Sequence, residues 1–166
     1  MTNRASINAN LTVHQEGSAS GGTLAFDGSM NYAKELAAGI GADQFDIAYV
    51  AERTVADGAN DDIDLAGVLT DAFGATITAA EVIAVMIINR KKNGQANTTN
   101  LTLGGGSNPI TGFSTAVLKP GDMLLMSATT ATGLFAVTGG SADNLRIANS
   151  AGAQNKYQIA ILARSA

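Results

Sequence analysis

The sequence contains no cysteine, no tryptophan and a single histidine, His14, in 166 residues. Without cysteine the chain can form no disulfide, no thiolate zinc site and no cysteine nucleophile. His14 lies beside Val13 in an alternating segment, with no recognisable nucleophile or orienting partner, which favours a surface residue over a general base. A G-x-S-x-G nucleophile elbow is also absent. We therefore predict no catalytic residue and no enzyme.

Charge is scarce as well, at 14% of the residues against roughly 25% in an average soluble domain. The net charge of −4 argues against a nucleic-acid partner, because domains that grip phosphates carry a basic face. The basic run 90–92 precedes Asn93 and Gly94, which is typical of a solvated turn. The longest apolar run, 82–88, is too short to span a membrane. A chain of low charge often hides surface in an assembly, so we expect a homo-oligomer.

Short apolar or alternating runs, separated by Gly, Asn, Asp and Ser, dominate the rest of the chain. The clearest strand candidates are residues 5–13, 44–56, 81–90 and 156–164. Of these, 81–90 is apolar on both faces, which predicts a central strand covered on both sides. About eight to ten strands at turn spacings near 8–12 residues are typical of an antiparallel sandwich. We predict an all-β fold, with an N-terminal arm or strand segment in residues 1–40 and an antiparallel β-sandwich or jelly roll in residues 41–166.

Three segments do not follow the strand pattern. Residues 65–73 place four apolar side chains at helical spacing before Gly74, which predicts one short helix at about 66–73, packed on the sheet. Residues 30–38 fit a helix and a strand equally. The segment GSASGG at 17–22 indicates a flexible turn or linker.

Three consecutive glycines, Gly104 to Gly106, follow a short apolar run. A Walker loop needs a lysine and a following helix, and a dinucleotide fingerprint needs G-x-G-x-x-G before a helix. Here Ser107 and Asn108 lead to Pro109, and neither pattern is met. We interpret the run as a strand end opening into a turn that needs positive φ or close backbone approach, and we expect no cofactor.

Five of the fourteen acidic residues lie between Asp57 and Asp71. From Asn60 onward their spacing imitates an EF-hand loop, but Leu65 stands where that loop needs glycine. We favour a solvated turn, with a bound cation as the alternative, and we predict no metal site. The acidic corner is a candidate interaction surface, as is the N-terminal alternating segment. The candidate residues are Asp57, Asp61, Asp62 and Asp64 in the corner, and Ile7, Leu11 and Val13 in the segment.

A distinctive order of motifs runs through residues 45–164. The pattern D-L-A-x-x-L-T-D-A-F-G at 64–74 leads into a long apolar strand ending in Asn89. LTLGGGSNP, a Pro-Gly turn in LKPGDMLLM, and GSADNLRIANSAGAQNKYQIAIL follow in that order. Together these segments resemble a family of small virion proteins of tailed bacteriophages. The resemblance implies jelly-roll-like β-sandwich modules that decorate or cement capsids, often as trimers where capsomers meet.

The resemblance thus predicts a structural protein of the capsid surface, made in the cytoplasm of a bacterial host. Its expected partners are further copies of the chain, as a homotrimer, and the major capsid protein. One alternative is a head-fibre or tail-fibre component that contacts the host surface, although the chain shows no repeats or shaft. Another is an enzyme or sugar-binding module on the same fold, which lacks catalytic groups and tryptophan platforms.

Overall fold

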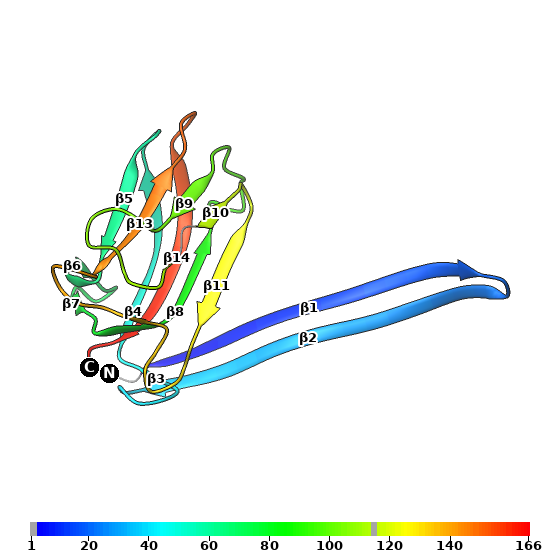
Figure 1. Cartoon of the computed structure of the whole chain (residues 1–166), viewed down its shortest axis with the longest axis horizontal. Coiled ribbons are helices and arrows are strands. Elements are labelled where there is room, and N and C mark those ends of the chain that lie inside the picture. The colour runs from blue at the N-terminus through cyan, green and yellow to red at the C-terminus, as the bar shows by residue number, and fades with distance from the viewer. Residues whose placement is uncertain (1–2, 114–115) are drawn as a thin grey trace. The chain divides into compact units, whose positions relative to one another are not determined.

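The structure, a computed structural model, describes residues 3–113 and 116–166, and every helix or strand element within them is a β-strand (Figure 1). The prediction of an all-β chain is confirmed. Contacts divide the chain into two units, Met1–Ala37 and Ala38–Ala166, where the sequence placed a boundary after residue 40. The first unit is a two-stranded hairpin, and the second is a β-sandwich.

The hairpin consists of β1 (Arg4–Ala19) and β2 (Gly22–Ala38). The strands pair antiparallel along their whole length without a register shift. The predicted strand at 5–13 is confirmed and is longer than the sequence indicated. Residues 30–38, which fitted helix and strand equally, belong to β2. Because successive side chains in a strand point to opposite faces, odd residues of β1 and even residues of β2 share one face of the hairpin.

The segment 17–22 closes the hairpin. Gly21 N donates to Ala19 O at 2.7 Å, which reverses the chain within two residues. Gly22 takes a φ of +143°, a backbone conformation that residues with a Cβ rarely adopt. The glycines that suggested a linker are therefore the tight turn between two paired strands.

Two antiparallel β-sheets, one of four strands and one of five, form the sandwich (Figure 1). The first sheet has the order β10 (Ala116–Leu118), β9 (Leu101–Leu103), β13 (Asn144–Asn149), β5 (Asn60–Asp64). The second has the order β11 (Met123–Ser127), β8 (Glu81–Ile88), β14 (Asn155–Arg164), β4 (Ile47–Val55), and β12 (Phe135–Ala136) also pairs with β8. Three short strands complete the unit, namely β3 (Gln44–Phe45), β6 (Ala66–Thr70) and β7 (Thr76–Thr78).

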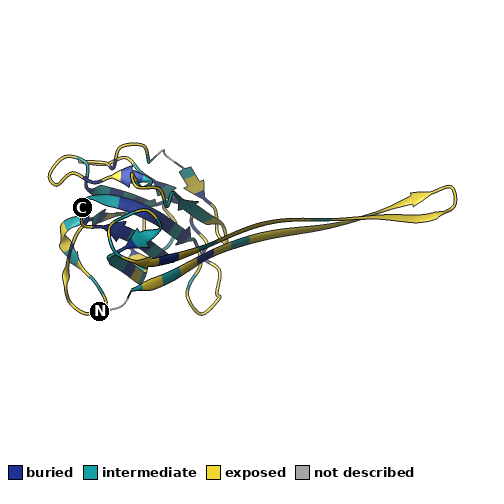
Figure 2. Ribbon diagram, turned by 90° about the horizontal axis from the view of Figure 1, so that it is seen from below, coloured by how far each residue is buried: buried dark blue, intermediate teal, exposed yellow. Residues whose placement is uncertain are grey.

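The hydrophobic core lies between the two sheets, where alternate residues of each strand point inward. From the first sheet it takes Ile63, Leu101, Leu103, Leu145 and Ile147. From the second it takes Tyr49, Val85, Ile87, Tyr157, Ile159 and Ile161, among others. Figure 2 shows the buried residues gathered in the sandwich strands and exposed residues along most of the hairpin. The alternating runs of the sequence are thus the two inner faces of one sandwich.

The strand predicted at 81–90 is β8, and it is central, with β11 and β12 pairing on one side and β14 on the other. Its residues 82–85 are all buried, as a strand covered on both faces requires. Met86 and Ile88 are only half-buried, so the outward face of the sheet opens toward this end of the strand.

The short helix predicted at about 66–73 is wrong. Residues 66–70 form β6, which pairs with β7. The carboxylate of Asp71 accepts from the backbone N–H groups of Phe73 and Ala75, both at 2.9 Å, and so organises a turn. Gly67 has a φ of +123°, which is incompatible with a helix. Two isolated helical turns could not compete with these local bonds.

Candidate functional site

The acidic corner is built around a paired carboxylate. Asp61, on β5, accepts from Nε and Nη2 of Arg53 at 2.6 and 2.5 Å, and Tyr157 OH donates to it at 2.8 Å. Arg53 also donates to Tyr49 OH at 2.6 Å. Burial, and then the charge of Asp61, raise the pKa of Tyr157, while the hydrogen bond to Asp61 raises the pKa of Arg53. Asp61 belongs to the first sheet and its partners to the second, so this group joins the two sheets.

The other three acids of the corner also have partners within the chain. Asp62 accepts from Nε and Nη2 of Arg146 at 2.6 and 2.7 Å, and this bonding lowers the pKa of Asp62. Asp57 and Asp64 each accept from a backbone N–H at 2.7 Å. Within residues 3–113 and 116–166, no group of three or more His, Asp or Glu could hold a metal ion. Of the four acids, only Asp57 and Asp62 are exposed, and both are already paired within the chain.

The glycine run 104–106 is a sharp turn. Gly104, Gly105 and Gly106 have φ values of +85°, +75° and +85°, so the predicted need for positive φ is confirmed. At Gly106 there is also close approach, because a Cβ there would lie 2.5 Å from Nε of Arg146. No atom lies within 4 Å of the corresponding position at Gly105. The run thus lets the chain bend past the arginine that binds Asp62.

We expect Gly106→Ala to lower the free energy of unfolding by about 2 kcal/mol, because it combines left-handed strain with displacement of Arg146. Gly105→Ala is the matched control, with the same strain and open space, and should cost about 1 kcal/mol. Urea unfolding of both variants measures the difference. Equal losses would mean that the arginine moves aside without cost.

His14 lies on the polar face of the hairpin. In its protonated form it donates to Asp27 from Nδ1 at 2.5 Å and to Glu16 from Nε2 at 3.1 Å. These two carboxylates raise its pKa, with Asp27 the larger cause. All three side chains are more than half exposed. The histidine thus pairs across the two strands with Asp27 and along its own strand with Glu16.

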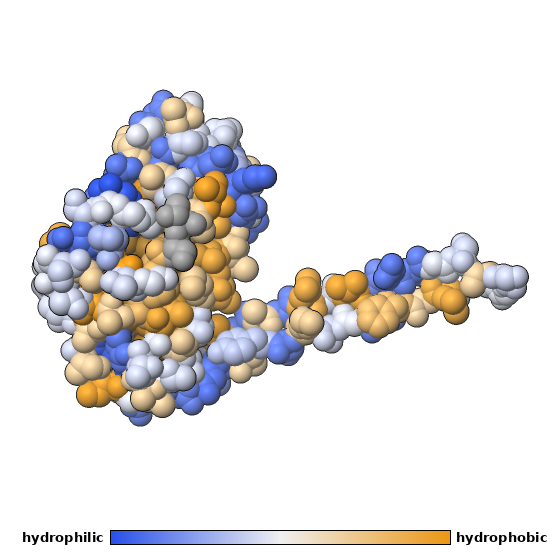
Figure 3. All heavy atoms as spheres, in the orientation of Figure 1, coloured by the Kyte–Doolittle hydropathy of each residue, from blue (hydrophilic) through white to orange (hydrophobic). Residues whose placement is uncertain are grey.

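The opposite face of the hairpin carries large apolar side chains that are exposed toward the turn. Of the three candidates that the sequence singled out there, Leu11 and Val13 are exposed, at 61% and 45%, whereas Ile7 is buried. The structure adds side chains from β2 that sequence reasoning did not select. They are Leu24, Phe26, Met30 and Tyr32, all exposed. Figure 3 shows hydrophobic residues spaced along the hairpin between hydrophilic ones.

A second uncovered apolar surface lies on the outward face of the second sheet. It holds a depression of about 260 Å³ lined by Val50, Met86, Ile88 and Ala160 together with the polar residues Glu52, Lys92 and Gln158. Val50 is 74% exposed. The backbone N–H of Lys92 donates to the carboxylate of Glu52 at 2.5 Å, which closes one rim. The depression thus combines apolar side chains with the polar side chains of Glu52, Lys92 and Gln158.

Comparison with known protein families, with curated proteins and with solved structures finds no match for this chain. In the described part of the chain, no helix is long and apolar enough to cross a membrane.

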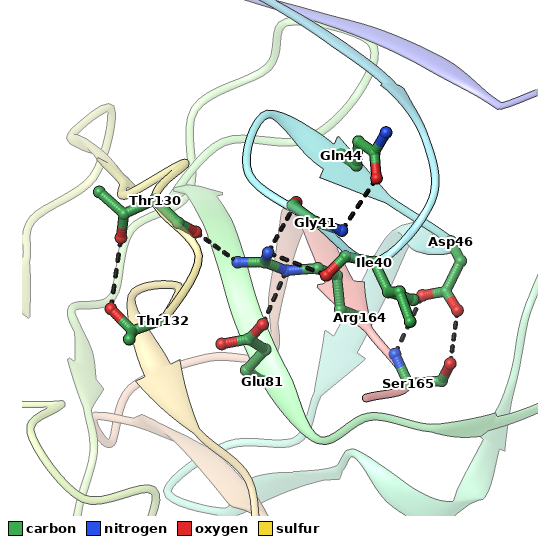
Figure 4. Close-up of polar contacts among 9 residues, drawn as sticks. All are labelled: Ile40, Gly41, Gln44, Asp46, Glu81, Thr130, Thr132, Arg164 and Ser165. Carbon is green, nitrogen blue, oxygen red and sulfur yellow. Dashed lines mark hydrogen bonds and ion pairs between the residues drawn. The ribbon is translucent and has the colours of Figure 1, made fainter.

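Sequence reasoning missed the residue with the most polar contacts to backbone carbonyls, Arg164 at the end of β14 (Figure 4). Its side chain is fully buried. Nη1 donates to the carbonyls of Ile40 and Gly41 at 3.2 and 2.7 Å, and Nη2 donates to that of Thr130 at 2.6 Å. Nε forms an ion pair with Glu81 at 2.8 Å. These contacts all lie within the chain, so they give Arg164 a structural role.

Proposed function

We propose that this chain is a structural virion protein of a tailed bacteriophage, which decorates or cements the capsid by binding between capsomers as an oligomer. The sandwich is then a jelly-roll-type module, and the hairpin is an arm that contacts neighbouring subunits. The expected partners are other copies of the chain, as a homotrimer, and the major capsid protein. The site of action is the capsid surface of the virion.

The observation that carries the proposal is the contrast between paired charges and uncovered apolar surfaces. Buried ionic groups of the sandwich pair with one another, as Arg53 does with Asp61 and Arg164 with Glu81. By contrast, large apolar side chains on the hairpin and around Val50 face solvent. Contiguous exposed apolar surface of this kind marks interaction sites in folded proteins. Such a molecule is suited to packing against other proteins.

The motif residues behind the family resemblance support a structural role. Asn149 donates to the carbonyls of Ala56 and Ala153 at 2.9 and 2.8 Å. Asp143 accepts from the backbone N–H of Gly140 and from the side chain of Asn144. These hydrogen bonds hold the turns against the neighbouring strands. A motif of this kind specifies a shape, which is what a decoration module needs.

We expect the purified chain to co-sediment with assembled capsids and not with free major capsid protein. On the sandwich, Val50→Asp should abolish co-sedimentation, because it places a charge on the outward apolar face. Val68→Asp is the matched control, since Val68 on β6 is 73% exposed against 74% for Val50. The control should bind as the wild type does.

The location of the protein on native particles decides between the proposal and its alternative. Cryo-electron microscopy should reveal density for the chain on the head, between capsomers. Density on the tail alone would overturn the decoration role in favour of a fibre component. Absence of co-sedimentation at every capsid concentration tested would overturn any capsid role.

A further inference from the structure

One face of the hairpin carries an apolar stripe, in which Gln15 is the polar residue opposite Phe26. We define the arm stripe as six residues, Leu11 and Val13 of β1 and Leu24, Phe26, Met30 and Tyr32 of β2. The register places Leu11 directly opposite Met30, and Val13 opposite Gly28. A Cβ at Gly28 would lie 2.9 Å from the ring of Phe26, so that ring lies over the glycine and fills the stripe. The six side chains are between 45% and 77% exposed.

The two faces of the hairpin differ sharply in charge. The register puts His14, Glu16 and Asp27 on the face opposite the arm stripe, together with a series of Asn, Ser and Thr. Between Leu11 and Met30 the stripe face itself holds no ionisable residue. The stripe can therefore be buried without burying a charge.

The exposed apolar side chains of this hairpin favour packing against another protein surface. A two-stranded hairpin on its own is at best marginally stable in water, and this one exposes its largest apolar side chains. Each of the six stripe residues is at least 45% exposed, so contact between two stripes would remove apolar surface of both copies from water.

We propose that the arm stripe packs against the same stripe on other copies of this chain, so that the arms of one oligomer enclose a shared apolar core. The stripe is self-complementary, because two identical apolar surfaces without charge can pack against each other. The charged faces of both hairpins then remain in solvent. The outward face around Val50 is a poorer match, since Glu52, Lys92 and Gln158 line it. The inference deepens the proposed function and rests on it for the expectation that the chain is oligomeric.

Paired aspartate variants test the stripe in the full-length chain. F26D/M30D places two charges on the stripe, and S29D/N31D places the same two charges on the opposite face of the same strand. Size-exclusion chromatography with light scattering should give an oligomer for the wild type and for S29D/N31D. F26D/M30D should fall to the monomer mass, a threefold loss if the assembly is a trimer. Unchanged thermal unfolding of the sandwich would confirm that only association is affected.

Single cysteines give an independent readout, because the chain has none of its own. Oxidation of Met30→Cys should produce covalently linked copies in high yield. Asn31→Cys, one residue further on and on the opposite face, should not. Linkage at both positions to the same extent would contradict packing through the stripe.

The outcomes separate this inference from the proposed function. A wild type that is monomeric at every concentration, or an F26D/M30D variant that keeps the wild-type mass, would overturn the inference. If F26D/M30D keeps that mass but no longer co-sediments with capsids, the stripe binds the capsid protein, which also overturns it. If the stripe variants behave as expected and the wild type does not co-sediment with capsids, the capsid role is overturned and the self-association is retained.

Discussion

Arg164→Met is expected to lower the free energy of unfolding by about 3–5 kcal/mol, the loss typical of removing one partner from a buried ion pair. Methionine fills much of the same volume, so the loss reports polar contacts rather than a cavity. The carboxylate of Glu81, whose side chain is only 14% exposed, would lose its partner at 2.8 Å. The carbonyls of Ile40, Gly41 and Thr130 would each lose a charged donor.

Arg146→Met is the matched control for Arg164→Met. Arg146 forms a bidentate pair with Asp62, but its side chain is 26% exposed and that of Asp62 is 43% exposed. Solvent screens such a pair, so the control should cost less than about 1 kcal/mol. Both variants are compared in urea at one protein concentration, because the apparent stability of an oligomer depends on concentration. Equal losses in the two variants would contradict a structural role for the buried arginine.

Arg164 also illustrates what the sequence could not predict. Strand β14 was predicted because Tyr157, Ile159 and Ile161 alternate with smaller or polar residues, and burial of all three confirms this. Alternation is a local property, so it needs no knowledge of the partner strands. Arg164 is buried by loops around Gly41 and Thr130, which are more than thirty residues away in sequence, and no local pattern identifies such contacts.

The helix expected at about 66–73 failed for a related reason. Spacing of three and four residues also arises by chance in a short strand followed by a turn. Val68 and Phe73, which a helix would have placed on its packed side, are 73% and 77% exposed. The turn signals at Gly67 and Asp71 were the better guide, because positive φ and side-chain bonds to backbone act within a few residues.

The candidate surfaces were predicted in part. Leu11 and Val13 were selected from β1, since their alternation is clear, but the other four residues of the arm stripe lie on β2. There the spacing of Tyr32, Leu36 and Ile40 also fitted one side of a helix. Only the register of the hairpin shows that both strands contribute to one face. Which acids of the corner pair with which arginines likewise depends on strand order, as for Asp61 and Arg53.

At the other end of β14, a cluster of buried amides joins the two sheets. Asn89 follows β8 and Asn155 begins β14, both in the second sheet, and both are fully buried. Asn89 Nδ2 donates to the carbonyls of Thr99 and Leu118 at 2.9 Å each, beside β9 and on β10 of the first sheet. Asn89 Oδ1 accepts from Asn155 Nδ2 at 3.0 Å and from a second amide at 2.9 Å. One side chain thus makes four buried hydrogen bonds.

We expect Asn89→Leu to lower the free energy of unfolding by about 3 kcal/mol, because it keeps the volume while its buried partners each lose a hydrogen bond. Asn89→Asp should cost at least as much, since it turns a carboxylate oxygen toward the carbonyls of Thr99 and Leu118. Asn93→Leu is the control, because Asn93 is an exposed turn residue that accepts one bond, from Gln95 N at 3.0 Å, and it should cost under about 1 kcal/mol. Urea unfolding ranks the three variants. An Asn89→Leu loss within 1 kcal/mol of the control would contradict the view that this cluster, with Arg164 at the opposite end of the strand, keeps the two sheets in fixed register.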